Sequence, residues 1–177
     1  MEWVLVGLGN PGKEYEGTRH NVGRDVLSAV EKKSPLRAKI LIPETYMNDS
    51  GKAVGKMVKS KKAAERLAVL HDDLDLPFGR VKLSFGSSSG GHRGVHSIQT
   101  VLKTKDFVRI RIGISPATPG GKTKKPSGEE KVVAFVLGKF KPAEQEKLKK
   151  VRKTVSEALE ILLLEGKEKA MTAINGR

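Results

Sequence analysis

The stretch from Val4 to Asn21 constrains the fold of this chain more than any other. It begins with a short apolar run, is interrupted by glycines and a proline, and continues as a polar loop until a helical pattern starts near residue 22. A buried strand followed by a loop and a helix is typical of α/β proteins, which usually place their chemistry on such loops. We therefore expect an α/β fold with a functional site at the end of this strand.

A dinucleotide site is the alternative interpretation of this stretch. Gly7, Gly9 and Gly12 have the spacing G-x-G-x-x-G directly after the apolar run. In dinucleotide-binding folds, however, the helix begins within the glycine run, so that its first amides face the pyrophosphate. Here Pro11 lies inside the run and residues 12–18 have the composition of a loop, which disfavours a dinucleotide site.

Composition limits the classes of function. The 34 Lys and Arg residues against 20 Asp and Glu give a net charge of +14, which favours a polyanionic partner, nucleic acid before an anionic membrane. Some of the lysines also fit a solubilising surface. The chain has no cysteine, which excludes disulfides and thiolate zinc sites. Without a membrane-length apolar run or a signal-peptide pattern, a cytoplasmic protein is expected.

The rest of the chain alternates between strand and helix patterns. We expect a single three-layer α/β/α domain over residues 1–177, with a mixed, mostly parallel sheet and a long basic C-terminal helix. Basic residues near the start of that helix form a stripe that suits a phosphate backbone. The expected strands are the short apolar run from Val4 and residues 39–43, 67–70, 80–85, 108–114 and 132–137, and the expected helices are residues 21–33, 52–62, 96–103 and 142 onward.

Four polar segments follow expected strands: residues 10–20, 46–48, 71–75 and 90–93. The carboxyl ends of parallel strands meet at one edge of a sheet, so these segments are expected to converge. The chain has no cysteine and no G-x-S-x-G elbow, which leaves hydrolysis by histidine-activated water as the simplest chemistry. His20 with Asp72 would supply the base, and Asn48 or Asn10 an amide donor to the oxyanion.

Metal sites are the remaining alternatives. Asp72, Asp73 and Asp75 form a carboxylate cluster, but there is no second cluster elsewhere. His92 and His96 lie four residues apart, a zinc-ligand spacing, yet the expected helix begins between them and no third ligand is evident. His71 has the position of a packed, hydrogen-bonded residue. We expect no metal and no cofactor.

Several motifs occur in a fixed order between the N-terminus and about residue 140. They are Val6–Gly12 with Tyr15 and Thr18–Asn21, residues 43–51 around Tyr46-Met47-Asn48, His71–Pro77, Gly90–Gly94, Arg109–Gly113 and Val136–Gly138. In this combination the chain resembles the bacterial peptidyl-tRNA hydrolase family, which cleaves the ester between a peptide and its tRNA.

The resemblance implies a role for each matching position. His20 would activate water, and Asp72 would stabilise and orient His20. Asn10 would hydrogen-bond the peptide carbonyl and so favour peptidyl-tRNA over unblocked aminoacyl-tRNA. Asn48 would hold the scissile region. Tyr15 and Tyr46 would line the channel for the peptide and terminal nucleotide, and Arg111 would contact the 5′-phosphate of the tRNA. The implied partner is peptidyl-tRNA, with no membrane, no cofactor and no obligate protein partner, and a monomer is expected.

The chain also departs from the family pattern. Arg93 stands where the family commonly has Asn, so a substrate contact there would pass through a guanidinium. Ser84 takes the place of a second phosphate-contacting lysine, with Lys82 or Arg80 as substitutes. Residues 87–89 are serines in a loop that is richer in glycine in the family, and the segment from residue 33 to 38 is short. A non-catalytic RNA-binding protein on the same scaffold is therefore the alternative function.

Overall fold

The computed structural model describes residues 1–177 and contains one five-stranded sheet. The strand order is β2-β1-β3-β5-β4, and only β4 runs antiparallel to its neighbour. The strands are β1 (Val4–Gly7), β2 (Lys39–Leu41), β3 (Leu67–Pro77), β4 (Val81–Phe85) and β5 (Val108–Ser115). The expected mixed, mostly parallel sheet is confirmed.

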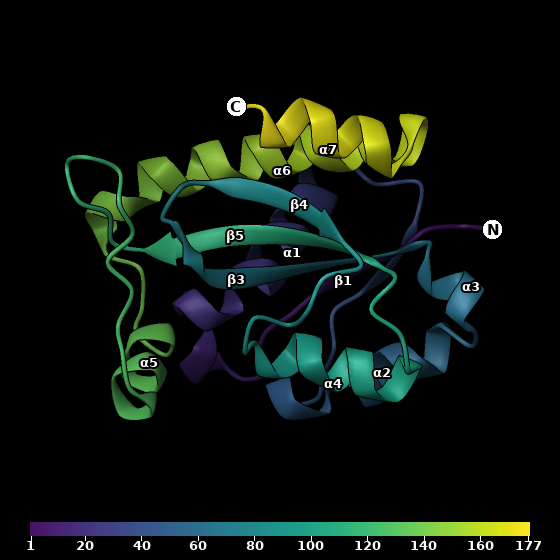
Figure 1. Ribbon diagram of the computed structural model, residues 1–177, viewed down its shortest axis with the longest axis horizontal. Coiled ribbons are helices and arrows are strands. Elements are labelled where there is room, and N and C mark those ends of the chain that lie inside the picture. Colours follow the sequence, from purple (N-terminus) through teal and green to yellow (C-terminus); the bar gives the residue numbers. More distant parts are fainter.

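Helices cover both faces of this sheet, which confirms the three-layer α/β/α architecture (Figure 1). One face carries α1 (Val22–Lys33), α6 (Gln145–Glu165) and α7 (Lys167–Asn175). The other carries α2 (Ser50–Met57), α3 (Lys61–Ala64) and α4 (Arg93–Leu102). The remaining helix, α5 (Glu129–Val136), lies beyond the ends of β3 and β5 (Figure 1).

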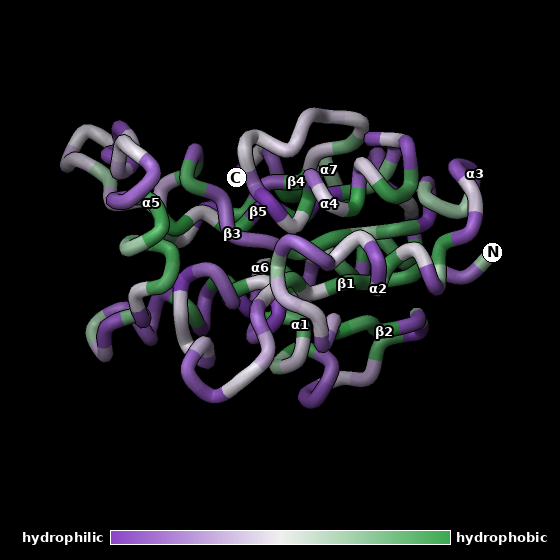
Figure 2. Tube along the Cα trace, turned by 90° about the horizontal axis from the view of Figure 1, so that it is seen from below, coloured by the Kyte–Doolittle hydropathy of each residue, from purple (hydrophilic) through white to green (hydrophobic).

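Side-chain alternation along the strands divides the core between the two layers. Leu5 of β1 packs in the cluster with α1 and α6, whereas Val4 and Val6 pack in the cluster with α2 and α4. In β5, Ile110 and its alternate neighbours are buried against the first layer, which leaves Arg109 and Arg111 on the opposite face. Figure 2 shows the resulting apolar strands between hydrophilic loops.

Glycines allow α1 to pack unusually close to the sheet. A Cβ on Gly23 would clash with the carbonyl of Leu70 in β3, and a Cβ on Gly7 would come within 2.8 Å of the Gly23 carbonyl oxygen. Helix α1 begins at Val22, well after the glycine run, unlike the helix of a dinucleotide-binding fold. The glycines of β1 and α1 therefore serve helix–sheet packing.

We predict that Gly23→Ala destabilises the protein by about 1–3 kcal/mol, because α1 must move away from β3 to accommodate the methyl group. Urea unfolding followed by circular dichroism measures the change in free energy of unfolding. Gly120→Ala is the matched control, because the nearest atom to a Cβ there is 3.9 Å away. Equal stability of the two variants would contradict this account of the packing.

Several expected boundaries or elements were wrong; α4, for example, begins at Arg93 and not at residue 96. The chain from residue 71 to 77 continues β3 instead of leaving the sheet, because β5 supplies backbone partners as far as Pro77. Residues 132–137 form most of α5 and not a strand, since no strand lies beside them to pair with. The helix expected over 52–62 is divided into α2 and α3, and Ser60 caps the second. Helix α7 was not anticipated. It follows Gly166, whose φ of 96° ends α6.

No helix of the structure is both long and apolar enough to span a membrane.

Candidate active site

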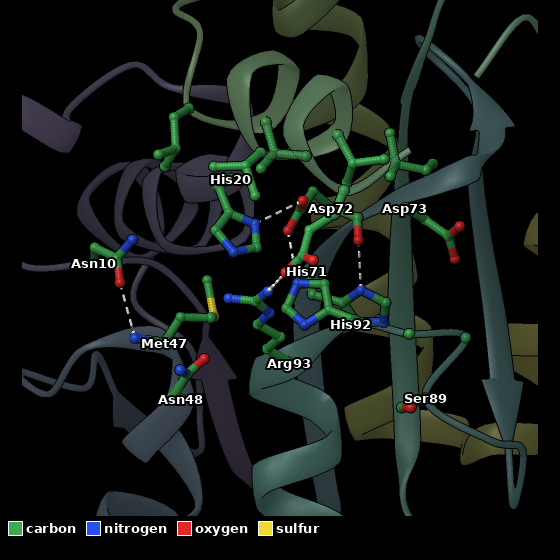
Figure 3. Close-up of a pocket in the computed structure, with 18 of the residues that line it drawn as sticks. Asn10, His20, Met47, Asn48, His71, Asp72, Asp73, Ser89, His92 and Arg93 are labelled. Carbon is green, nitrogen blue, oxygen red and sulfur yellow. Dashed lines mark hydrogen bonds and ion pairs between the residues drawn. The ribbon is translucent and has the colours of Figure 1, made fainter. Parts of the chain in front are cut away.

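The four polar segments converge on one cavity at the carboxyl edge of the sheet, as expected (Figure 3). The cavity has a volume of about 480 Å³. Asn10 and His20 reach it from the loop after β1, Met47 and Asn48 from the loop after β2, and Asp72 from β3. The loop after β4 contributes residues 89–92, α4 contributes Arg93, and α5 closes the opposite side.

His20 and Asp72, the pair expected from the sequence, are in direct contact. Nδ1 of His20 lies 2.8 Å from Oδ2 of Asp72, which is 3% exposed. The other carboxylate oxygen, Oδ1, lies 2.7 Å from Nε2 of His92. Asp72 therefore holds two imidazoles, one on each oxygen.

The hydrogen bonds fix the position of the proton on His92. Nδ1 of His92 accepts the backbone N–H of Val95 at the start of α4, so it cannot carry a proton itself. The hydrogen of the neutral ring must then lie on Nε2, which donates to Asp72. With Oδ1 occupied in this way, Oδ2 remains free to accept the Nδ1–H of His20, and Nε2 of His20 keeps its lone pair.

The pKa values agree with this assignment. Burial disfavours a charged Asp72, but the two imidazoles outweigh it and hold the pKa of the carboxyl well below its usual range. Burial also disfavours a charged His20, yet attraction and hydrogen bonding to Asp72 raise its pKa above 6.5. Asp72 is therefore an ionised acceptor at neutral pH, and its charge shifts the pKa of His20 upward.

Asn10 presents its amide nitrogen rather than its oxygen to the cavity. Its Oδ1 accepts the backbone N–H of Met47 at 2.8 Å, which leaves Nδ2 without a partner within the protein. Its backbone is clamped by Asn21, whose side chain accepts from the Asn10 N–H at 2.8 Å and donates to the Asn10 carbonyl at 2.9 Å. The geometry makes Asn10 a preorganised hydrogen-bond donor.

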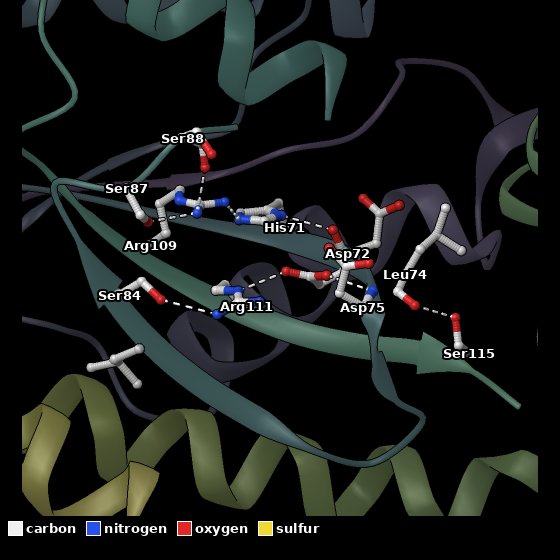
Figure 4. A network of polar contacts seen from close by, with 12 residues as sticks. His71, Asp72, Leu74, Asp75, Ser84, Ser87, Ser88, Arg109, Arg111 and Ser115 are labelled. Atoms are coloured by element: carbon white, nitrogen blue, oxygen red, sulfur yellow. Dashed lines mark hydrogen bonds and ion pairs between the residues drawn. The ribbon is translucent and has the colours of Figure 1, made fainter. Parts of the chain in front are cut away.

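A second polar network adjoins the cavity through His71 and Asp72 (Figure 4). Nδ1 of His71 contacts the Asp72 carbonyl at 2.7 Å, and the Arg109 guanidinium lies 3.3 Å from Nε2 of His71. Arginine only donates, so His71 is neutral with its proton on Nδ1, and burial first, then the neighbouring His92 and Arg109, lower its pKa well below 6.5. Arg109 also binds Ser87 Oγ and the Ser88 carbonyl, which tethers the serine loop. The packed role expected for His71 is confirmed.

The expected substrate residues divide into two groups. Asn48, Tyr46 and Arg93 line the cavity, and Asn48 does not cap α2. Tyr15 does not line it but packs edge-on against Tyr46, with ring centroids 6.3 Å apart.

Arg111 and Lys82 lie outside the cavity, on neighbouring strands. Arg111 forms an ion pair with Asp73 at 2.7 Å and donates to Ser84, the position that lacks the family lysine. Lys82 is the register partner of Arg111 across β4 and β5. The two cations therefore share one face of the sheet beside the site.

The carboxylates of the possible metal cluster, and His92 of the possible His92–His96 pair, have other partners in the structure. Asp73 is paired with Arg111 and Asp75 with Lys125, so two of the three clustered carboxylates form ion pairs. His92 faces Asp72 instead of pairing with His96. The nearest arrangement to a ligand set is His20, Asp72 and His92, whose ligand atoms all lie within 4.8 Å of one another but bind each other by hydrogen bonds.

Sequence reasoning missed His92, Asn21 and the apolar wall that α5 contributes. His92 lies in the Gly90–Gly94 motif, and its position immediately before a helix was the available signal. The wall was missed because residues 132–137 were expected to be a strand. It consists of Val132, Val133, Val136 and Leu137.

Known proteins are similar to this chain in sequence and in fold. A family model described as peptidyl-tRNA hydrolase matches residues 4–39 and 36–177. The two ranges overlap at residues 36–39, within or next to the shortened segment from residue 33 to 38. The peptidyl-tRNA hydrolase of Herpetosiphon aurantiacus is 43% identical over 98% of this chain and 90% of the relative. That of Syntrophotalea carbinolica is 37% identical over 98% of this chain and 97% of the relative. The crystal structure of peptidyl-tRNA hydrolase from Acinetobacter baumannii superposes with a TM-score of 0.83 and 30% identity, over 98% of this chain and 94% of that one. The chain therefore belongs to the peptidyl-tRNA hydrolase family.

Proposed function

We propose that His20 is the general base in the reaction of this enzyme, the hydrolysis of peptidyl-tRNA. The observation that carries the proposal is the double clamp on Asp72. It accepts from both His92 and His20, so the proton of neutral His20 lies on Nδ1 while the basic Nε2 remains available in the cavity. A base held in one tautomer at a cavity wall is what the activation of water requires.

The steps follow from this geometry. Nε2 of His20 takes a proton from water as the water oxygen attacks the ester carbonyl, which forms a tetrahedral intermediate and an imidazolium. Asp72 stabilises the imidazolium. The intermediate then collapses, the bond to the ribose oxygen breaks, and His20 returns its proton to that oxygen. The products are a peptide with a free carboxyl group and a free tRNA, and no cofactor takes part.

The amides of Asn10 and Asn48 complete the proposed site. Nδ2 of Asn10 is unpaired and would donate to a carbonyl of the peptide, a group that an unblocked aminoacyl ester lacks at that position. Asn48 lines the same cavity and would bind the scissile region and the attacking water. An amide donor to a developing oxyanion contributes about 10² to 10³ in rate.

The flanking surfaces suit the two parts of the substrate. The apolar wall of α5 and the exposed ring of Tyr46, supported by Tyr15, would contact the peptide. The tRNA would be bound by Arg111 and Lys82 on the sheet and by the basic stripe of α6, in keeping with the charge of +14. Such a substrate belongs to translation, so we infer a cytoplasmic enzyme.

We also infer a monomer that needs no protein partner. Among the exposed large apolar side chains, Tyr46, Val133 and Leu137 border the cavity and therefore have a proposed ligand. The others belong to different segments: Met1 to the N-terminus, Met57 to α2, Val101 to α4 and Leu164 to α6. No large patch remains for a stable subunit interface. Sedimentation equilibrium would measure the mass in solution.

The non-catalytic alternative is not favoured. A protein that only binds RNA has no use for a base in a fixed tautomer, and the relatives are hydrolases. The test is the release of N-acetyl-amino acid from N-acetyl-aminoacyl-tRNA, with unblocked aminoacyl-tRNA in parallel. Salt-dependent tRNA binding without release would support the alternative.

Asn10→Asp provides a sharper version of this test. The aspartate keeps an oxygen for the Met47 N–H but replaces the free N–H₂ donor with a second oxygen. We predict that kcat/KM on the N-acetylated substrate falls at least about tenfold, because the variant loses the hydrogen bond to the peptide carbonyl. Because a carboxylate attracts the ammonium of the unblocked substrate, the selectivity between the two substrates should fall as well. Unchanged selectivity would show that Asn10 does not recognise the blocked end.

A further inference from the structure

Arg93 stands at the junction of two hollows. The active-site cavity adjoins a second hollow of about 570 Å³, which lies along α2 and α4 and is here called the α2/α4 groove. Four residues line both hollows: Asn48, Ser89, Gly91 and Arg93. A ligand held at His20 can therefore extend from the cavity into the groove past Arg93.

The two hollows differ in chemistry. The cavity has the apolar wall of α5, whereas the groove is lined almost entirely by polar side chains, among them Lys52, His96, Ser97 and Thr100. The groove has one carboxylate, Asp49, which pairs with Lys52 at 2.9 Å. Arg93 is thus the permanent cation of the groove that no groove residue neutralises.

The partner of Arg93 comes from the other side of the cavity. Its guanidinium lies 2.9 Å from Oε1 of Glu129, the first residue of α5. The two side chains are 58% and 81% exposed, so water screens the attraction and the pair is easily exchanged. Because the pair joins α4 to α5, it links the groove to the apolar wall.

We propose that Arg93 is a specificity-determining residue that binds a phosphate of the 3′-terminal nucleotides of tRNA, and that Glu129 holds its guanidinium until the phosphate replaces the carboxylate. The inference rests on the proposed function. With the ester at His20 and the peptide on the α5 wall, the terminal nucleotide extends along the groove, where its first phosphodiester meets Arg93. The planar guanidinium matches the two free oxygens of such a group.

The test compares two ester substrates that differ in phosphate content. One is the N-acetyl-aminoacyl ester of adenosine, which has no phosphate, and the other is the same ester of the trinucleotide CCA. Arg93→Gln should lower the ratio of kcat/KM values, trinucleotide over adenosine, by about tenfold, the loss of one charge-assisted hydrogen bond. The slope of log kcat/KM against log salt for the trinucleotide should become shallower by about 0.7, as for one lost contact to a single strand.

Glu129→Gln should change the ratio in the opposite direction. With its carboxylate removed, Arg93 is free for the phosphate, and the ratio should rise about two- to fivefold, the worth of an exposed ion pair. The matched control is Glu165→Gln, an exposed glutamate that pairs with Lys169 on the far layer of the protein and should leave the ratio unchanged. An unchanged ratio and salt slope in Arg93→Gln would overturn the proposal.

Binding of the free trinucleotide separates this inference from the proposed function. Titration of CCA measures affinity without turnover, and Arg93→Gln should weaken it about tenfold. If the wild type releases no peptide but Arg93→Gln weakens binding, the proposed function is wrong and the role of Arg93 stands. If the wild type is active and Arg93→Gln binds CCA like the wild type, the role of Arg93 is wrong.

Discussion

Replacement of His20 with alanine is expected to lower kcat on N-acetyl-aminoacyl-tRNA by about 10² to 10⁴, the usual contribution of a general base. The methyl group has no lone pair to take the proton of water, while Asn10, Asn48 and the basic surfaces remain. The variant should therefore still bind tRNA with a salt-dependent affinity. Circular dichroism would establish that the fold is retained, and filter binding would measure the affinity.

The pH dependence tests the same residue in the wild type. Only neutral His20 acts as a base, so kcat/KM should rise with pH and be lost as pH falls through the pKa of His20. Burial lowers that pKa, but the charge and hydrogen bond of Asp72 raise it by more than burial lowers it. The midpoint of the acid limb should therefore lie above 6.5. The residual activity of His20→Ala should lack this acid limb. A fall in rate of less than tenfold, or an unchanged profile, would mean that another group activates the water.

Asp72→Asn should reduce kcat by about 10⁴, the loss seen when a comparable aspartate is replaced in a serine protease triad. The reason lies in His92. Its Nδ1 is committed to the Val95 N–H, so its Nε2 must donate, and the single oxygen of the introduced amide must turn toward it. The N–H₂ group of that amide then faces His20. Nδ1 of His20 has to become the acceptor, the proton moves to Nε2, and the base is lost.

The tautomer itself can be observed. Nitrogen NMR shifts of the His20 ring should place its proton on Nδ1 in the wild type and on Nε2 in Asp72→Asn. Asp75→Asn is the matched control, because Asp75 lies on the same strand but is half exposed and pairs with Lys125. It should remain as active as the wild type. If Asp72→Asn retained activity within tenfold of the wild type, orientation of His20 by Asp72 would not be needed for catalysis.

Much of the fold and the centre of the site could be predicted from the sequence. Short apolar runs followed by polar loops indicated the position of the sheet edge, and in a parallel sheet those loops must meet. The contact between His20 and Asp72 follows from that rule, although 52 residues separate them. The two-residue period of a strand likewise places the Arg109 and Arg111 side chains on one face of β5, opposite Ile110.

The remaining features depend on tertiary structure. The apolar run of residues 132–137 has the composition of a buried strand, and it becomes helical because no neighbouring strand is available and its apolar side covers the cavity. The role of His92 arises from where α4 begins, since only there does a backbone N–H fix its tautomer. The pairing of Arg93 with Glu129 joins residues 36 positions apart through the position of α5, which the sequence pattern assigned wrongly.

The last helix also has a consequence for how the chain is made. Asn175 of α7 accepts the backbone N–H of Leu83 and donates to the Leu83 carbonyl, at 2.8 and 2.9 Å, so its amide takes the place of a neighbouring strand at the free edge of β4. Ribosomes synthesise β4 long before they reach α7. Until then the nascent chain carries an open strand edge, the surface through which unfinished chains pair with one another. Completion of α7 is therefore the step that closes this edge of β4 at Leu83.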